Sequence, residues 1–223
     1  MNNNGFIIRP ASINDIPFLV KTIIEAEKSG TDKLPYTTIF GLTEEETKKY
    51  LSEILMEDTD GCELSISSYL IAEKDGKNAA AAAAWIEAAG GIASTILKGN
   101  LLNYILPSVC ITQATKSDFI IRPLHIDNIP RTIQLGIVYV SPDFRGLSLV
   151  SMLIDEHIHR LTTINHSISE MYVQVFENNA PAIKTYKKEN FSLILTKESA
   201  DINILSYLPS NKKILMKKEL FTT

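Results

Sequence analysis

Cysteine and histidine are scarce in this sequence, which argues against disulfides and metal centres. The 223 residues include two cysteines, Cys62 and Cys110, which lie far apart and in no metal-ligand spacing. His157 and His159 are two positions apart on an expected helix, so their side chains point in different directions and do not form a metal-binding pair. We therefore expect free thiols, a cytoplasmic protein and no metal.

The sequence also lacks the runs that mark nucleic-acid and membrane proteins. The net charge is -4, and no arginine-rich stripe or long basic run occurs, which argues against a nucleic-acid partner. The first residues show no basic segment followed by an apolar stretch, so no secretory signal is expected. The longest apolar stretch, around Ala79–Ala89, is too short and too rich in alanine to span a bilayer, so no membrane partner is expected.

What is present is the balance of a globular protein. Hydrophobic residues make up 45% of the chain and charged residues 22%, which favours a single domain over residues 1–223. Near its start, Gly5–Arg9 is typical of a short strand. Ser12 followed by Asp15 resembles a helix-capping pattern, and apolar residues then recur at helical spacing until Gly30.

A second helix and a β-hairpin follow. We expect Pro35–Gly41 to be a loop and Thr43 to cap the helix, with three glutamates near its positive end. Tyr69–Glu73 is strand-like, and Asp75–Gly76 supplies a tight turn. The returning segment, Asn78–Glu87, contains six consecutive alanines; helix propensity alone favours a helix there, but the turn before it favours a strand.

The region from residue 88 to 131 has no clear pattern. Ile92–Leu106 is predicted as one helix. Phe119–Pro130 (FIIRPLHIDNIP) is similar to Phe6–Pro17 (FIIRPASINDIP), as in an internal repeat. The second copy runs directly into a strand, so it cannot begin a second domain, and we interpret the similarity as coincidence or a local echo. We interpret residues 88–131 as an insertion that covers the active site.

The last third alternates strands and helices. The predicted order is strand, helix, strand, helix and two further strands, which indicates a mixed α/β protein. These elements are expected at Thr132–Val140, Gly146–Leu161, Met171–Phe176, Asn179–Lys188, Phe191–Thr196 and Lys213–Leu220.

Two segments of this third carry chemical information. In the first, a buried strand ends at Val140 and a short loop with Arg145 and Gly146 opens a helix, whose first-turn amides form a ready anion site. A plain strand–helix corner with a surface arginine is an equal alternative. In the second, Asn179 precedes a helix that carries Tyr186; a lone tyrosine of this kind is more often an ordinary half-buried aromatic.

Together the two segments resemble the GCN5-related N-acetyltransferase (GNAT) family. The family's cofactor signature is matched at Val140, Pro142, Arg145 and Gly146. Its second signature is matched at Asn179, Ala182, Tyr186 and Phe191. The resemblance covers most of the chain apart from residues 88–131, and it implies the family fold, a mixed central sheet flanked by helices.

The resemblance also implies a cofactor, a reaction and a set of roles. Acetyl-CoA is expected to lie along the strand ending at Val140, with its diphosphate on the amides that follow, and an amine attacks the thioester directly. A backbone amide near Val138 steadies the oxyanion, and Tyr186 donates a proton to the leaving thiolate. The residues expected to bind the cofactor are Val138, Tyr139, Val140, Arg145, Gly146, Leu147, Ser148, Leu149, Val150, Asn179 and Tyr186.

Three departures from the family pattern bear on activity. Ser148 and Val150 stand where the family prefers small residues, and valine adds bulk where the phosphates approach. Gln134 lies where many members have a glutamate as general base, and it cannot take a proton. Glu73 and Glu87 on the hairpin strands are the replacement candidates, although each is more often a surface carboxylate.

Three functions follow from these residues. The first is an active N-acetyltransferase for the primary amine of a small molecule or an amino terminus, with a homodimer through the C-terminal strands as a plausible assembly. The second is a catalytically degenerate acyl-CoA sensor, motivated by the three departures. The third is an interaction module that keeps only the fold.

Overall fold

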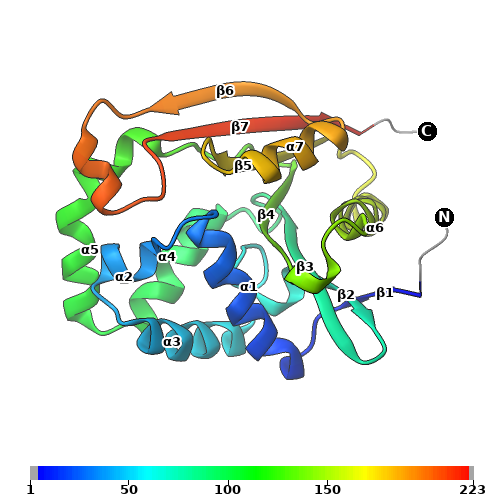
Figure 1. Cartoon of the computed structure of the whole chain (residues 1–223), viewed down its shortest axis with the longest axis horizontal. Coiled ribbons are helices and arrows are strands. Elements are labelled where there is room, and N and C mark those ends of the chain that lie inside the picture. Colours follow the sequence, from blue (N-terminus) through cyan, green and yellow to red (C-terminus); the bar gives the residue numbers. More distant parts are fainter. Residues whose placement is uncertain (1–4, 221–223) are drawn as a thin grey trace.

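The structure, a computed structural model, describes residues 5–220 and has one seven-stranded mixed sheet with helices on both faces (Figure 1). The strand order is β1-β2-β3-β4-β5-β7-β6, and β4 and β5 form the parallel pair. The strands are β1 (Ile7–Pro10), β2 (Tyr69–Lys74), β3 (Lys77–Ile86), β4 (Ile133–Val140), β5 (Glu170–Phe176), β6 (Ser192–Glu198) and β7 (Lys212–Glu219). The predicted mixed sheet with flanking helices is confirmed.

The helices divide between the two faces of the sheet. One core cluster contains residues of α1, α2, α3, α4 and α5, and the other contains residues of α6 and α7. The α-helices are α1 (Ile16–Lys28), α2 (Pro35–Phe40), α3 (Glu44–Glu57), α4 (Ser94–Ile105), α5 (Ser108–Ile121), α6 (Leu149–Ile164) and α7 (Ala180–Lys188). Within residues 5–220, none of the helices combines the length and the apolar character that crossing a bilayer requires.

The capping signals at the N-terminal helices formed as the sequence indicates. Ser12 and Asp15 make a capping box, and Asp15 also accepts two hydrogen bonds from Arg9 at 2.8 and 2.9 Å. Thr43 caps α3 by accepting from the Glu46 amide at 3.1 Å. The segment Pro35–Gly41 is not a loop as expected. Its first six residues form α2, because proline fits the first helical turn and Gly41, with φ of 69°, ends it.

The polyalanine segment is a buried strand at the centre of the sheet. Ala79 to Ala84 lie in β3, where both faces are covered by helices. Alternate alanines face α6, and Ala81 and Ala83 face the α1 side. Such small side chains let the helices approach the sheet closely. The buried His157 of α6 bonds the Ala82 carbonyl oxygen through Nε2 at 2.9 Å.

Residues 88–131, in which the sequence shows no clear pattern, contain two helices and a 3₁₀ turn. The helix expected at Ile92–Leu106 is α4, which begins at Ser94, and α5 follows it. The repeated pentapeptide FIIRP forms β1 near the N-terminus, but at residues 119–123 it ends α5 and starts a 3₁₀ turn. The similarity between the two copies is therefore not a structural repeat.

Candidate active site

A wedge-shaped gap opens in the sheet between β4 and β5. Residues Ile133 to Leu135 of β4 pair with Met171 to Val173 of β5, and the pairing ends after Leu135. From Gly136 to Val140, the edge of β4 that faces β5 has no strand partner within the described residues. Main-chain groups on that edge are therefore available to an extended ligand.

A bulge in β4 lies at the point where the strands part. In the pairing of β3 with β4, Ala82 faces Val138 but Ala84 faces Leu135, so β4 carries an extra residue at Gly136–Ile137. Gly136 is required there, because a Cβ atom would lie 2.7 Å from the indole ring of Trp85. The indole thus packs directly on the strand backbone beside the gap.

The loop between β4 and α6 presents unpaired amides to the same gap. The predicted helix start at Gly146 is wrong by three residues, because α6 begins at Leu149. Gly146 and Ser148 have positive φ angles of 79° and 59°, which are not helical. The amides from Ser148 to Ser151 donate no hydrogen bond within residues 5–220. Four free amides at the positive end of a 16-residue helix favour an anion such as a diphosphate.

Helix α7 forms the opposite wall. Asn179 caps it, accepting from the Ala182 amide at 3.2 Å, and its Nδ2 donates to Ser29 Oγ at 3.3 Å. Tyr186 is buried, and its ring lies 5.7 Å from that of Phe191. Burial raises the pKa of the Tyr186 phenol well above its ordinary value, so it stays protonated at neutral pH.

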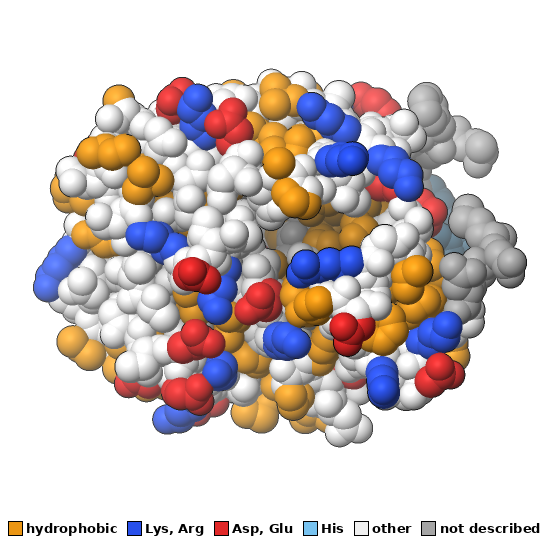
Figure 2. Space-filling view, viewed as in Figure 1, with side chains coloured by type: hydrophobic (Ala, Val, Ile, Leu, Met, Phe, Trp, Pro, Cys, Tyr) orange, Lys and Arg blue, Asp and Glu red, His pale blue; other side chains and the backbone are white. Residues whose placement is uncertain are grey.

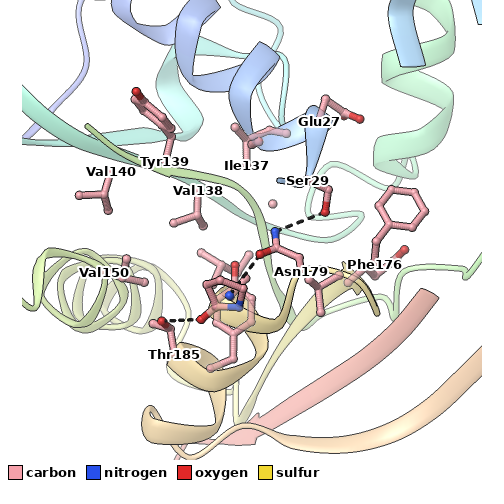
Figure 3. A pocket seen from close by; sticks show the side chains of 18 of the residues that line it. Glu27, Ser29, Ile137, Val138, Tyr139, Val140, Val150, Phe176, Asn179 and Thr185 are labelled. Atoms are coloured by element: carbon pink, nitrogen blue, oxygen red, sulfur yellow. Dashed lines mark hydrogen bonds between the residues drawn. The ribbon is translucent and has the colours of Figure 1, made fainter. Parts of the chain in front are cut away.

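These parts surround a cleft of about 1100 Å³. Figure 2 shows the hollow among β4, α6 and α7, with hydrophobic side chains in its floor and basic side chains at its rim. All the sequence-predicted cofactor residues line it: Val138, Tyr139, Val140, Arg145, Gly146, Leu147, Ser148, Leu149, Val150, Asn179 and Tyr186. Figure 3 shows Val138 and Val140 side by side on β4, with Val150 of α6 on the opposite side of this space. Neither Ser148 nor Val150 fills it.

The two carboxylates predicted as bases do not line the cleft. Glu73 lies near the β1 edge of the sheet, where it accepts from Arg9 Nε at 2.7 Å. Glu87 is 2% exposed and accepts from the Trp85 indole at 3.0 Å and from the amide and hydroxyl of Ser94 at 2.9 and 2.6 Å. Both carboxylate oxygens of Glu87 therefore accept hydrogen bonds, and these bonds hold the start of α4 against the end of β3. The structure thus gives both residues structural partners; those of Glu87, Trp85 and Ser94, line the cleft, whereas Glu87 itself does not.

Four charged residues of the cleft were not singled out in the sequence. Glu63 and Lys98 form an ion pair at 2.7 Å, and Glu27 and Lys213 lie near them. Burial opposes the charge on Glu63, but Lys98 outweighs that effect and lowers the pKa of the carboxyl. Burial lowers the pKa of Lys213 to about 8. No local motif marks these residues, because they come from α1, α4, β7 and the chain before β2.

Gln134 is buried and has a local partner. It lies in β4 where the pairing with β5 still holds, and its Nε2 donates to Thr132 Oγ1 at 2.7 Å. The amide therefore lines the closed end of the cleft as a structural group. Gln134 therefore supplies no general base from this strand.

The fold and cleft match a known class of protein. The model of the acetyltransferase (GNAT) family matches residues 36–191. The chain therefore belongs to the GNAT family, as the sequence resemblance predicted. Family membership supports acetyl transfer as the general activity.

Solved structures agree with this assignment at the level of fold. An N-acetyltransferase from Staphylococcus aureus Mu50 superposes with a TM-score of 0.65 at 14% identity, over 95% of this chain and 100% of that one. A polyamine N-acetyltransferase from Drosophila melanogaster gives 0.56 at 13% identity, over 96% and 100%. An agmatine N-acetyltransferase gives 0.57 at 14% identity, over 97% and 100%. No curated protein matches the sequence significantly.

Proposed function

We propose that this protein transfers the acetyl group of acetyl-CoA to the primary amine of a small molecule or an amino terminus. The observation that carries the proposal is the meeting of three features in one cleft. These are the free amides from Ser148 to Ser151, the open edge of β4 and the protonated phenol of Tyr186. Each suits a different part of the cofactor: diphosphate, pantetheine amides and thioester.

The residues present fit acetyl-CoA. Arg145 lines the cleft beside the free amides and supplies a cation for the phosphates. The edge of β4 from Gly136 to Val140 offers donors and acceptors in the spacing of a strand. When bound, the cofactor supplies an activated acetyl group as a thioester.

The chain's own groups have three tasks in the transfer. An amide on the open edge of β4 holds the negative charge that develops on the carbonyl oxygen when the amine attacks. Tyr186 donates its proton, or a hydrogen bond, to the sulfur as the carbon–sulfur bond breaks. An ammonium must lose one proton before its nitrogen attacks, and Glu27 is the cleft carboxylate that we propose receives it, because Glu63 is already bound to Lys98. The nitrogen loses a second proton as the amide forms, and that proton replaces the one that Tyr186 gives to the sulfur.

Calorimetry and a thiol-release assay test this proposal together. Acetyl-CoA should bind, and free thiol should appear when amines are added. Tyr186→Phe should lower kcat by roughly 10²-fold or more, the usual scale for a general acid, with little change in affinity. Tyr104→Phe is the matched control, because Tyr104 is 75% exposed on α4.

The same experiment separates the alternative of an acyl-CoA sensor. That function is favoured by Gln134, which leaves β4 without a base. Binding of acetyl-CoA with no thiol release from any amine would support the sensor and contradict catalysis. Absence of binding would contradict both.

Two further expectations remain part of the proposal. Strand β6 is the edge of the sheet and exposes Leu193, Ile194 and Leu195, which supports a homodimer through this edge. Sedimentation equilibrium of Leu193→Lys and of the unsubstituted protein tests the homodimer. If both proteins are monomers, the homodimer is contradicted.

The two cysteines are buried and unpaired, which supports the cytoplasm as the compartment.

A further inference from the structure

A second cavity of about 860 Å³ adjoins the cleft on the side of the insertion. It lies among α2, α4, α5, the 3₁₀ turn Arg122–Leu124 and Leu208, and most of its lining is apolar. Ile39, Phe40, Leu102, Ile111 and Leu208 are examples of this lining. The cavity therefore suits a hydrocarbon or aromatic group.

The two spaces meet at a charged neck. Five residues line both the cleft and the second cavity, and we call them the neck: Glu27, Lys98, His125, Phe176 and Lys213. Figure 3 shows Glu27 on α1 and Phe176 on β5 at the side of the cleft away from α6. A ligand that reaches from the cleft into the second cavity must pass these side chains.

One anion and one cation of the neck form no direct ion pair within the described residues, although the charge of Glu27 acts on Lys213 from nearby. Lys98 is held by Glu63 at 2.7 Å. Within the described residues, Glu27 and Lys213 form no hydrogen bond or ion pair, and Lys213 Nζ lies 5.8 Å from the centre of the Phe176 ring. The neck therefore presents one carboxylate and one ammonium, each able to bind a group of opposite charge.

A third polar group near the neck is without a partner. The Tyr36 hydroxyl is buried, lines the second cavity and has no hydrogen-bond partner within residues 5–220. Such groups are rare in folded proteins, because leaving one unpaired is costly. It is close enough to Lys98 and Glu27 for their charges to act on it.

From this arrangement we infer that the acceptor is a zwitterionic amine with an apolar arm, of which an α-amino acid with an apolar side chain is the simplest case. Its ammonium lies at Glu27, its carboxylate at Lys213, and its side chain in the second cavity. The inference rests on the proposed function and specifies its acceptor. Because Glu63 already pairs with Lys98, the neck offers one carboxylate and one ammonium, and a zwitterion matches both charges, whereas a purely cationic acceptor such as a polyamine leaves Lys213 unmatched.

The charge requirement is tested with pairs of acceptors in the thiol-release assay. Phenylalanine and leucine are compared with phenethylamine and isoamylamine, which lack only the carboxylate, and with spermidine. We expect kcat/KM at least about tenfold higher for the amino acids, the scale of one charge-assisted hydrogen bond. Equal or better turnover of the decarboxylated amines or of spermidine would overturn the inference while leaving acetyl transfer intact.

Lys213→Met should remove most of that preference, so that the ratio between each amino acid and its amine falls toward one. Lys212→Met is the matched control, because the neighbouring Lys212 on β7 pairs with Glu177 and Glu198 and lines neither space. Unchanged acetyl-CoA binding shows that each variant is folded. A preference that survives Lys213→Met contradicts the assignment.

The cavity requirement is tested on α5. Ala114 lines the second cavity, so Ala114→Phe should lower kcat/KM more for phenylalanine than for alanine as acceptor. Thr112→Phe places the same ring on the exposed side of α5 and should not change that ratio. Ala114→Leu gives a milder version if the larger residue impairs folding. Equal losses for both acceptors would contradict an apolar arm in this cavity, and no acetyl-CoA binding by the unsubstituted protein would instead defeat the proposed function.

Discussion

The buried histidine of α6 should make the stability of the protein depend on pH in a defined window. His157 is 1% exposed, its Nε2 bonds the Ala82 carbonyl oxygen at 2.9 Å, and its Nδ1 has no partner among the described residues. Burial is the main reason that its pKa falls from 6.5 to about 4, and the charge of Arg160 adds to this. The hydrogen bond to Ala82 acts in the opposite direction.

The sign of the effect follows from proton binding. Between pH 6.5 and about 4, the unfolded chain binds a proton at this histidine and the folded protein does not. Stability is therefore lost as pH falls through that window. At about 1.4 kcal/mol per pKa unit, a fall from 6.5 to about 4 corresponds to a loss of about 3 kcal/mol.

Urea denaturation from pH 7 to pH 4 measures this loss for the parent and two variants. His157→Gln keeps a donor for Ala82 but does not titrate, so its free energy of unfolding should fall by about 3 kcal/mol less than that of the parent. His159→Gln, on the exposed side of the same helix, should behave like the parent. If the His157→Gln and parent curves run parallel across the window, the reasoning is refuted.

Three further substitutions test the elements around the cleft, each by urea denaturation and acetyl-CoA titration. Ser148→Gly should stabilise the protein by about 1 kcal/mol and keep or improve cofactor affinity, because φ of 59° is costly for serine; destabilisation would contradict this. Gly136→Ala should cost roughly 1–3 kcal/mol because its Cβ would clash with Trp85, whereas Gly90→Ala, with open space around it, should cost little; equal effects would contradict the close packing. Glu87→Gln should lower the free energy of unfolding by roughly 1.5–3 kcal/mol, because its hydrogen bonds to the start of α4 become weaker. If this variant loses turnover without losing stability, Glu87 acts in catalysis instead.

Much of the fold was predictable because its signals are local. The capping residues Ser12 and Thr43 and the turn at Gly76 fix where elements begin and reverse. The corner that we propose holds the cofactor could be located for the same reason, since Val140 to Gly146 and Asn179 to Tyr186 are each continuous segments. The helix start at Gly146 was missed because Ser148 adopts a left-handed conformation that glycine usually takes.

The rest depended on contacts that the sequence does not reveal. The pentapeptide FIIRP is a strand at β1, where it pairs with β2, and a helix end at α5, where it pairs with no strand among the described residues. The neck brings together Glu27 and Lys213 from opposite ends of the chain. Glu73 and Glu87 looked available as bases, but their partners Arg9 and Ser94 are set by tertiary packing.

Amide NMR gives the most direct test of the central claim that the start of α6 binds a diphosphate. Titration with coenzyme A should move the amide signals of Ser148 to Ser151, because these protons gain phosphate acceptors. Titration with pantetheine, which lacks the diphosphate, should move signals of β4 but leave those four amides unchanged. Coenzyme A binding with no response from Ser148 to Ser151 would contradict the account.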